Sequence, residues 1–84
     1  MTLVEKYRAA AKDYAAQWDV QDDHVINIAA SILMTRDGVL RGGSFVQAVV
    51  DNNLNEAIGR ADNTCINHLR LFVGIKNNVP PIND

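Results

Sequence analysis

The sequence predicts an all-α fold: a small single-domain bundle of four to five helices that associates into an oligomer. Apolar residues recur at helical spacing through most of the chain. Residues that favour helix starts precede each periodic segment, and Gly, Asn or Pro separates the segments. The 84 residues are expected to form one domain, 1–84, with helices near 2–18, 23–36, 44–52, 53–60 and 63–77 and a mobile tail at 79–84.

The first predicted helix, residues 2–18, begins with a capping-box pattern made by Thr2 and Glu5. One face carries an apolar stripe that consists of Leu3, Tyr7, Ala10, Ala11, Tyr14 and Trp18. Its aromatic residues could stack on a nucleobase, but packing in the core is the favoured interpretation. Asp22 or Asp23 is expected to cap the next helix.

Residues 23–36 form the most apolar segment, and they are apolar nearly all round a helix: Val25, Ile26, Ile28, Ala29, Ala30, Ile32, Leu33 and Met34. Such a helix should be buried on all sides. A domain of this size can hardly cover one helix completely, so part of it is expected to face another subunit of a homo-oligomer. A central strand is the alternative because β-branched residues are frequent, although the length and the alanines favour a helix. Gly38 is expected to end it in a left-handed conformation.

The segment from Arg41 to Asn63 predicts two short helices. Ser44 with Gln47, and Asn53 with Glu56, both have the capping-box pattern. The polar residues 51–53 between them favour a turn. One continuous helix would also fit the apolar spacing, but the broken arrangement is preferred.

Residues 63–77 predict the last helix, capped by Asp62 or Asn63 and ended by Pro80 and Pro81. Its apolar arc is wide, and it comprises Ile66, Leu69, Leu71, Phe72, Val73 and Ile75. This arc is a second indication of self-association.

Composition narrows the function classes. The formal net charge of −2 disfavours a protein that coats nucleic acid electrostatically. No apolar run approaches the length of a membrane helix, and no signal-peptide core is recognisable near the N-terminus. The single cysteine excludes an intrachain disulfide. A cytoplasmic location is therefore expected, without a membrane partner.

No enzyme signature is present. Cys65, His24 and His68 lack a zinc-ligand spacing, and a Cys65–His68 nucleophile pair would lack an orienting group. A buried cysteine beside a surface histidine is the favoured interpretation. Asp22 and Asp23 beside His24 are better explained as helix caps than as cation ligands. No catalytic residue, metal site or cofactor is expected.

Two arginines lie beside predicted helix starts, where backbone N–H groups and the helix dipole attract anions. We expect an anion-binding pocket made by Arg41, Gly43, Ser44, Arg60 and Asn63. Asp62 would accept a hydrogen bond from a ribose hydroxyl or simply cap the helix, and the cap is preferred. A turn at the glycines and a structural Arg60–Asp62 ion pair are the alternatives.

The segments 42–46 (GGSFV), 48–49 (AV), 52–54 (NNL), 56–57 (EA) and 59–62 (GRAD) resemble a pattern of small phage-encoded proteins, GG-[SF]-F-x-x-A-V-x-x-N-D-L-x-x-A-x-x-R-A-D before a helix that ends near a proline. The resemblance covers residues 42–81, and Asn53 replaces the usual Asp. It implies an accessory protein in the cytoplasm of an infected bacterium that blocks host immunity. It assigns no catalytic residue, but it draws attention to Asn52, Asn53, Arg60 and Asp62.

Three classes of function follow. The first is an oligomeric sponge that sequesters a nucleotide-derived immune signal without cleaving it. The second is an anti-CRISPR-type inhibitor that binds a host defence protein through an exposed apolar patch. The third is a small DNA-binding protein with a helix-turn-helix-like order, which the negative charge and the few basic residues of the last helix disfavour.

Overall fold

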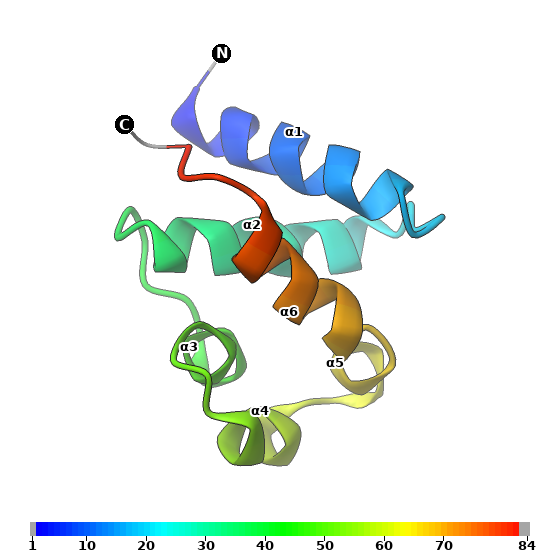
Figure 1. Ribbon diagram of the computed structural model, residues 1–84, viewed down its shortest axis with the longest axis vertical. Helices are drawn as coiled ribbons and strands as arrows, with labels where there is room; N and C mark the ends of the chain where they lie inside the picture. The colour runs from blue at the N-terminus through cyan, green and yellow to red at the C-terminus, as the bar shows by residue number, and fades with distance from the viewer. Residues whose placement is uncertain (1, 83–84) are drawn as a thin grey trace.

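The computed structural model describes residues 2–82, and it confirms an all-α fold in which no strand occurs within that range. The helices are α1 (Leu3–Ala16), α2 (Asp23–Arg36), α3 (Ser44–Val50), α4 (Leu54–Arg60), α5 (Asn63–Asn67) and α6 (Leu69–Asn78). Figure 1 shows α1 and α2 side by side, α6 crossing α2, and the short helices α3 and α4 below α2. Between residues 2 and 82, no helix has the length and apolarity needed to cross a membrane.

The centre of the fold is α2. Its buried residues are Val25, Ile26, Ala29, Ala30, Ile32, Leu33 and Met34. They are covered within one chain, because α1, α3 and α6 each pack against α2. Three helices of the same chain therefore cover most of the apolar surface that was expected to face another subunit, and the homo-oligomer stays a prediction. Ile32 is fully buried and Ile28 is half-buried in the single chain.

The apolar stripe of α1 is narrower than the sequence predicts. Tyr7, Ala11 and Ala15 are fully buried against the core, and the two alanines allow α1 and α2 to approach closely. The helix ends at Ala16 instead of residue 18. Trp18 consequently lies in the turn after α1 with 41% of its surface exposed, so its assignment to the core is wrong.

Three helices end with the same backbone conformation. Asp19, Gly38 and Asn52 have φ values of 57°, 78° and 60°, which is the left-handed region. In each case the N–H of the following residue reaches back five residues to a helix carbonyl, as in the Schellman motif. Gly38 was predicted in this role. Asn52 interrupts the helix between α3 and α4, which confirms two short helices instead of one continuous helix.

Side-chain caps confirm most of the predicted helix starts. Thr2 and Glu5 form a complete capping box, and Asp22, Asn53 and Asp62 each accept a hydrogen bond from a backbone N–H of the first turn that follows. The Ser44–Gln47 capping box is wrong, because Gly43 occupies the N-cap of α3 and has no side chain to donate or accept.

The predicted last helix is broken at His68. In a continuous helix, the Thr64 carbonyl would accept the backbone N–H of residue 68. Here the imidazole Nδ1 of His68 lies 2.8 Å from that carbonyl oxygen and takes its place. The backbone N–H of His68 instead bonds the Cys65 carbonyl, and α5 and α6 meet at an angle, as Figure 1 shows.

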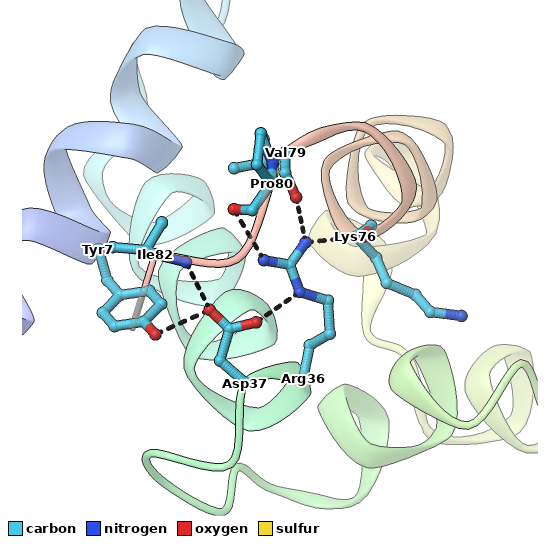
Figure 2. Close-up of polar contacts among 7 residues, drawn as sticks. All are labelled: Tyr7, Arg36, Asp37, Lys76, Val79, Pro80 and Ile82. Atoms are coloured by element: carbon cyan, nitrogen blue, oxygen red, sulfur yellow. Dashed lines mark hydrogen bonds and ion pairs between the residues drawn. The ribbon is translucent and has the colours of Figure 1, made fainter. Parts of the chain in front are cut away.

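The segment after α6 is held against the end of α2 by Arg36 (Figure 2). Its guanidinium donates to the carbonyl oxygens of Lys76, Val79 and Pro80 at 2.9, 2.5 and 3.2 Å. These carbonyls belong to the last turn of α6 and the residues after it. Since the prolines at 80 and 81 prevent further helix, Arg36 supplies the donors that an additional helical turn would have supplied.

Asp37 completes this clamp. One carboxylate oxygen accepts from Arg36 Nε at 2.8 Å, and the other accepts from the Tyr7 hydroxyl at 2.8 Å and from the Ile82 backbone N–H at 3.1 Å. Burial of the carboxyl raises its pKa, but the hydrogen bonds from Arg36, Ile82 and Tyr7 and the charge of Arg36 outweigh that effect. The pKa of Asp37 therefore lies below its ordinary value. The ion pair joins α2 to α1 and to the C-terminal segment.

The clamp differs from the mobile tail expected from residue 79 onwards. Val79 and Ile82 are half-buried and pack against the core, and both take part in the hydrogen bonds above. Residues 83 and 84 lie outside the described residues.

Asp37→Asn should lower the free energy of unfolding by about 3 kcal/mol, because it leaves the Arg36 charge only 16% exposed and without its ion-pair partner. Urea denaturation at neutral pH measures this loss. Asp13→Asn on the exposed face of α1 is the control, with an expected change within about 0.5 kcal/mol. Equal stability of the Asp37→Asn variant and the wild type would show that the clamp does not stabilise the fold.

The same carboxyl predicts a pH dependence. Because the pKa of Asp37 is lower in the folded chain than in the unfolded chain, its stabilisation is present above the unfolded value of about 4. It is lost as the pH falls through the folded value. Glu5 and Asp62 also have lowered pKa values, because they form hydrogen bonds to Thr2 and Cys65. Protonation of these two carboxyl groups should therefore also lower the stability of the wild type in acid. The difference in unfolding free energy between wild type and Asp37→Asn should shrink below about pH 4, and a constant difference would contradict this assignment.

Candidate functional site

The first group of predicted ligand residues lies at the start of α3. Arg41, Gly43 and Ser44 are all exposed. The Arg41 guanidinium donates to the side-chain oxygen of Gln47 at 3.0 Å, and the Gln47 amide donates to the Gly42 carbonyl at 2.6 Å. Gln47 therefore links the Arg41 side chain to the Gly42 carbonyl just before α3. These two hydrogen bonds take the place of the predicted Ser44–Gln47 capping box.

The second group lies between α4 and α5. Arg60 ends α4 and pairs with Glu56 one turn earlier, at 3.3 Å, with both side chains more than half exposed. Asn63 is the exposed first residue of α5. Asp62 accepts from the Cys65 backbone N–H at 2.8 Å, which confirms its role as a cap. Arg60 thus pairs with Glu56, and the alternative of an Arg60–Asp62 ion pair is not observed.

The two groups are not brought together in one chain. In Figure 1 the segment leading into α3 runs down the left, whereas the connection from α4 to α5 runs across the lower right. Within residues 2–82, no hydrogen bond or ion pair links Arg41, Gly43 or Ser44 to Arg60 or Asn63. None of the described hollows is lined by residues of both groups.

Cys65 and His68, two of the candidate chemical groups, have structural roles. Cys65 is buried and has a raised pKa because of burial and the neighbouring Asp62, so its thiol is protonated at neutral pH. His68 is half-buried, and its ring bonds the Thr64 carbonyl. In the part of the chain that the structure describes, no three His, Cys, Asp or Glu side chains are grouped to hold a metal ion.

An apolar groove of about 210 Å³ lies between α3, α4 and α6. Its apolar lining residues are Ala48, Val49, Leu54, Ala57, Leu69 and Val73, and Asn52 and Asn53 supply its polar groups. The groove exists because Asn52 turns the chain sharply, so α4 folds back beside α3 without filling the space next to α6.

The groove is bordered by exposed apolar side chains. Leu54 is 58% exposed, Ile58 is 49% exposed and Val73 is 38% exposed. Leu54 and Ile58 are one turn apart on α4, so they form a continuous ridge beside the groove. Together with Ala57 they form the apolar face of α4, of which only Ala57 is buried. The spacing of apolar residues identifies this face of α4. It does not show that α4 is too short and too peripheral to bury the face.

Gly59 has no structural role that the chain itself explains. A methyl group at Gly74 would collide with the Tyr14 hydroxyl, and one at Gly42 would lie 2.6 Å from Val46 Cγ1. A methyl group at Gly59 would meet nothing within 4 Å. Packing within the chain therefore does not require glycine at this position.

Comparison of this chain with known protein families, with curated proteins and with solved structures finds no match.

Proposed function

We propose that this protein is a binding module that takes an apolar helix of a partner protein into the groove between α3, α4 and α6. The observation that carries the proposal is the groove itself, lined by apolar side chains of three helices and bordered by the exposed ridge of Leu54 and Ile58. Grooves of this kind accept the apolar face of an amphipathic helix through side chains spaced three and four residues apart.

The surroundings of the groove support an apolar contact more than an electrostatic one. The charged residues of α4, Glu56 and Arg60, are paired with each other. Lys76 is hydrogen-bonded to Asn52, one of the two asparagines that line the groove. A partner helix would therefore bury Leu54, Ile58 and Val73.

The resemblance of residues 42–81 to phage accessory proteins suggests the biological setting. The partner would then be a host defence protein, and occupation of the groove would block its activity without chemistry. This is the inhibitor class, and the groove favours it over the ligand sponge because it is formed within a single chain.

Leu54→Glu and Ile58→Glu should each weaken binding of a partner protein by about tenfold or more, because both place a charged side chain where apolar contact is needed. Partners captured from a bacterial lysate would be purified, and their affinities measured by calorimetry. Val4→Glu on α1 is the control, since Val4 is 51% exposed and lies on a helix that does not line the groove. All three variants should keep the wild-type helical spectrum.

Unchanged affinity in both α4 variants would overturn the groove as the docking site. Sedimentation of the same proteins tests a further occupant. If the wild type forms a dimer that Leu54→Glu dissociates, the groove holds a second copy and not a host protein.

The nucleotide sponge is the second candidate, favoured by the exposure of all five predicted residues. The pairs Arg41–Gln47 and Arg60–Glu56 each occupy part of a guanidinium that has five N–H donors, which leaves others available for phosphate. Because the two groups are separate in one chain, Arg41, Gly43 and Ser44 of one copy would meet Arg60 and Asn63 of another. The sponge therefore requires a homo-oligomer.

Arg60→Ala should remove a nucleotide-induced rise in melting temperature while leaving the fold unchanged, because a lost charge-assisted hydrogen bond costs about 1.5–3 kcal/mol. A thermal-shift screen with cyclic dinucleotides and nucleoside monophosphates measures this effect. Arg8→Ala is the matched control, since Arg8 is also partly exposed and contacts Asp23 at 3.9 Å. The absence of any shift for the wild type would remove the sponge as a candidate.

The DNA-binding alternative receives the least support. Residues Leu71, Phe72 and Ile75 of α6 are buried. Of its two basic side chains, Lys76 bonds Asn52, and only Arg70, which lies over the Trp18 ring, has no oxygen acceptor within the described residues. The exposed surface of α6 therefore offers few free donors for base edges or phosphates.

A further inference from the structure

A hollow of about 260 Å³ lies where the turn after α1 meets the break between α5 and α6, away from the α4 ridge. It is lined by Trp18, Val20, Asn67, His68, Arg70 and Leu71. The turn contributes the first two residues, and the break at His68 contributes the others. A continuous helix over 63–77 would have placed Asn67 and Arg70 differently, so the hollow depends on that break.

Arg70 is the distinctive group in this hollow. Its guanidinium carbon lies 5.5 Å from the centroid of the Trp18 ring, which is a cation–π arrangement. Four other arginines, at positions 8, 36, 41 and 60, have an oxygen acceptor within 4 Å. Across residues 2–82, Arg70 is the one arginine with no such acceptor. The cation–π contact therefore holds the guanidinium beside Trp18 while its N–H donors have no acceptor within the described residues.

The other polar groups in the hollow complement this cation. Because its Nδ1 faces a carbonyl oxygen, which only accepts, the His68 ring must donate there. The indole N–H of Trp18 has no acceptor within the described chain, and Asn67 adds an exposed amide. Trp18, exposed to 41%, Val20 and Leu71 provide the apolar surface.

We propose that this hollow binds a small planar organic anion, an aromatic ring that carries one carboxylate or one phosphate group. Arginine grips either group through two parallel hydrogen bonds. The ring would stack against the Trp18–Arg70 pair, and the hollow is smaller than the pockets of about 300–1,000 Å³ that take larger organic ligands. This inference rests neither on the groove nor on the five-residue anion pocket.

The test uses the only tryptophan of the chain as its reporter, because Trp18 lies in the hollow. The full chain is titrated with benzoate, adenosine monophosphate, adenosine and inorganic phosphate, with excitation at the red edge of indole absorption and calorimetry as the second measurement. The expected result is a saturable change with benzoate or adenosine monophosphate, at affinities about tenfold or more above those of adenosine and inorganic phosphate. The better of the two ringed anions identifies the anionic group as carboxylate or phosphate.

Arg70→Gln should weaken binding of that ligand about 10- to 100-fold, which is the effect of losing a charge-assisted pair. Arg70→Lys should also weaken it, because lysine keeps the charge but lacks the planar fork. Arg8→Gln is the matched control and should bind as the wild type does. Leu54→Glu should also bind normally, which separates this site from the groove. The proposal is overturned if neither ringed anion gives saturable binding, or if Arg70→Gln binds as tightly as the wild type.

Discussion

Enclosure of α2 is the constraint on which the rest of this structure depends. A helix that is apolar on nearly every side must have neighbours on nearly every side. Here α1 lies along it, α6 crosses it and α3 lies beneath it. The edge-to-face contact of Phe45 and Phe72, with ring centroids 5.8 Å apart, joins two of these covering helices to each other. Once α2 is enclosed, α4 and α5 remain at the periphery, and there the apolar side chains are only partly covered.

The last residues of α2 and its C-cap extend this organisation to the ends of the chain. Arg36 and Asp37 are adjacent in sequence but contact different segments. Arg36 binds carbonyls after α6, whereas Asp37 binds Tyr7 of α1 and the backbone of Ile82. A carboxylate and a guanidinium in this position satisfy backbone groups that two prolines leave without helical partners. The result is a closed arrangement in which the two terminal segments meet over one end of the central helix, as Figure 2 shows.

The surfaces with binding chemistry occur where helices are interrupted. Asn52 in the left-handed region separates α3 from α4 and leaves the groove beside α6. The His68 side chain takes the Thr64 carbonyl, separates α5 from α6 and shapes the hollow beside Trp18. Each interruption replaces a local helical hydrogen bond by another interaction within the chain. The resulting change in helix direction creates concave surface in a domain too small to form a deep cleft.

The sequence alone determined the helical class, four of the five starts that it assigned to a cap, and the end of α2 at Gly38. These features depend on residues within a few positions of one another, such as Asp62 with Cys65. It also indicated that Cys65 would be buried and that Asp62 would act as a cap. It did not determine which apolar faces are covered: Leu54 and Trp18 have the same spacing signals as core residues but lie on the surface. Tertiary structure decided this, together with the Arg36 clamp and the Trp18–Arg70 pair. Apart from the adjacent Arg36–Asp37 pair, these contacts join residues that are 30 or more positions apart, so no local pattern in the sequence predicts them.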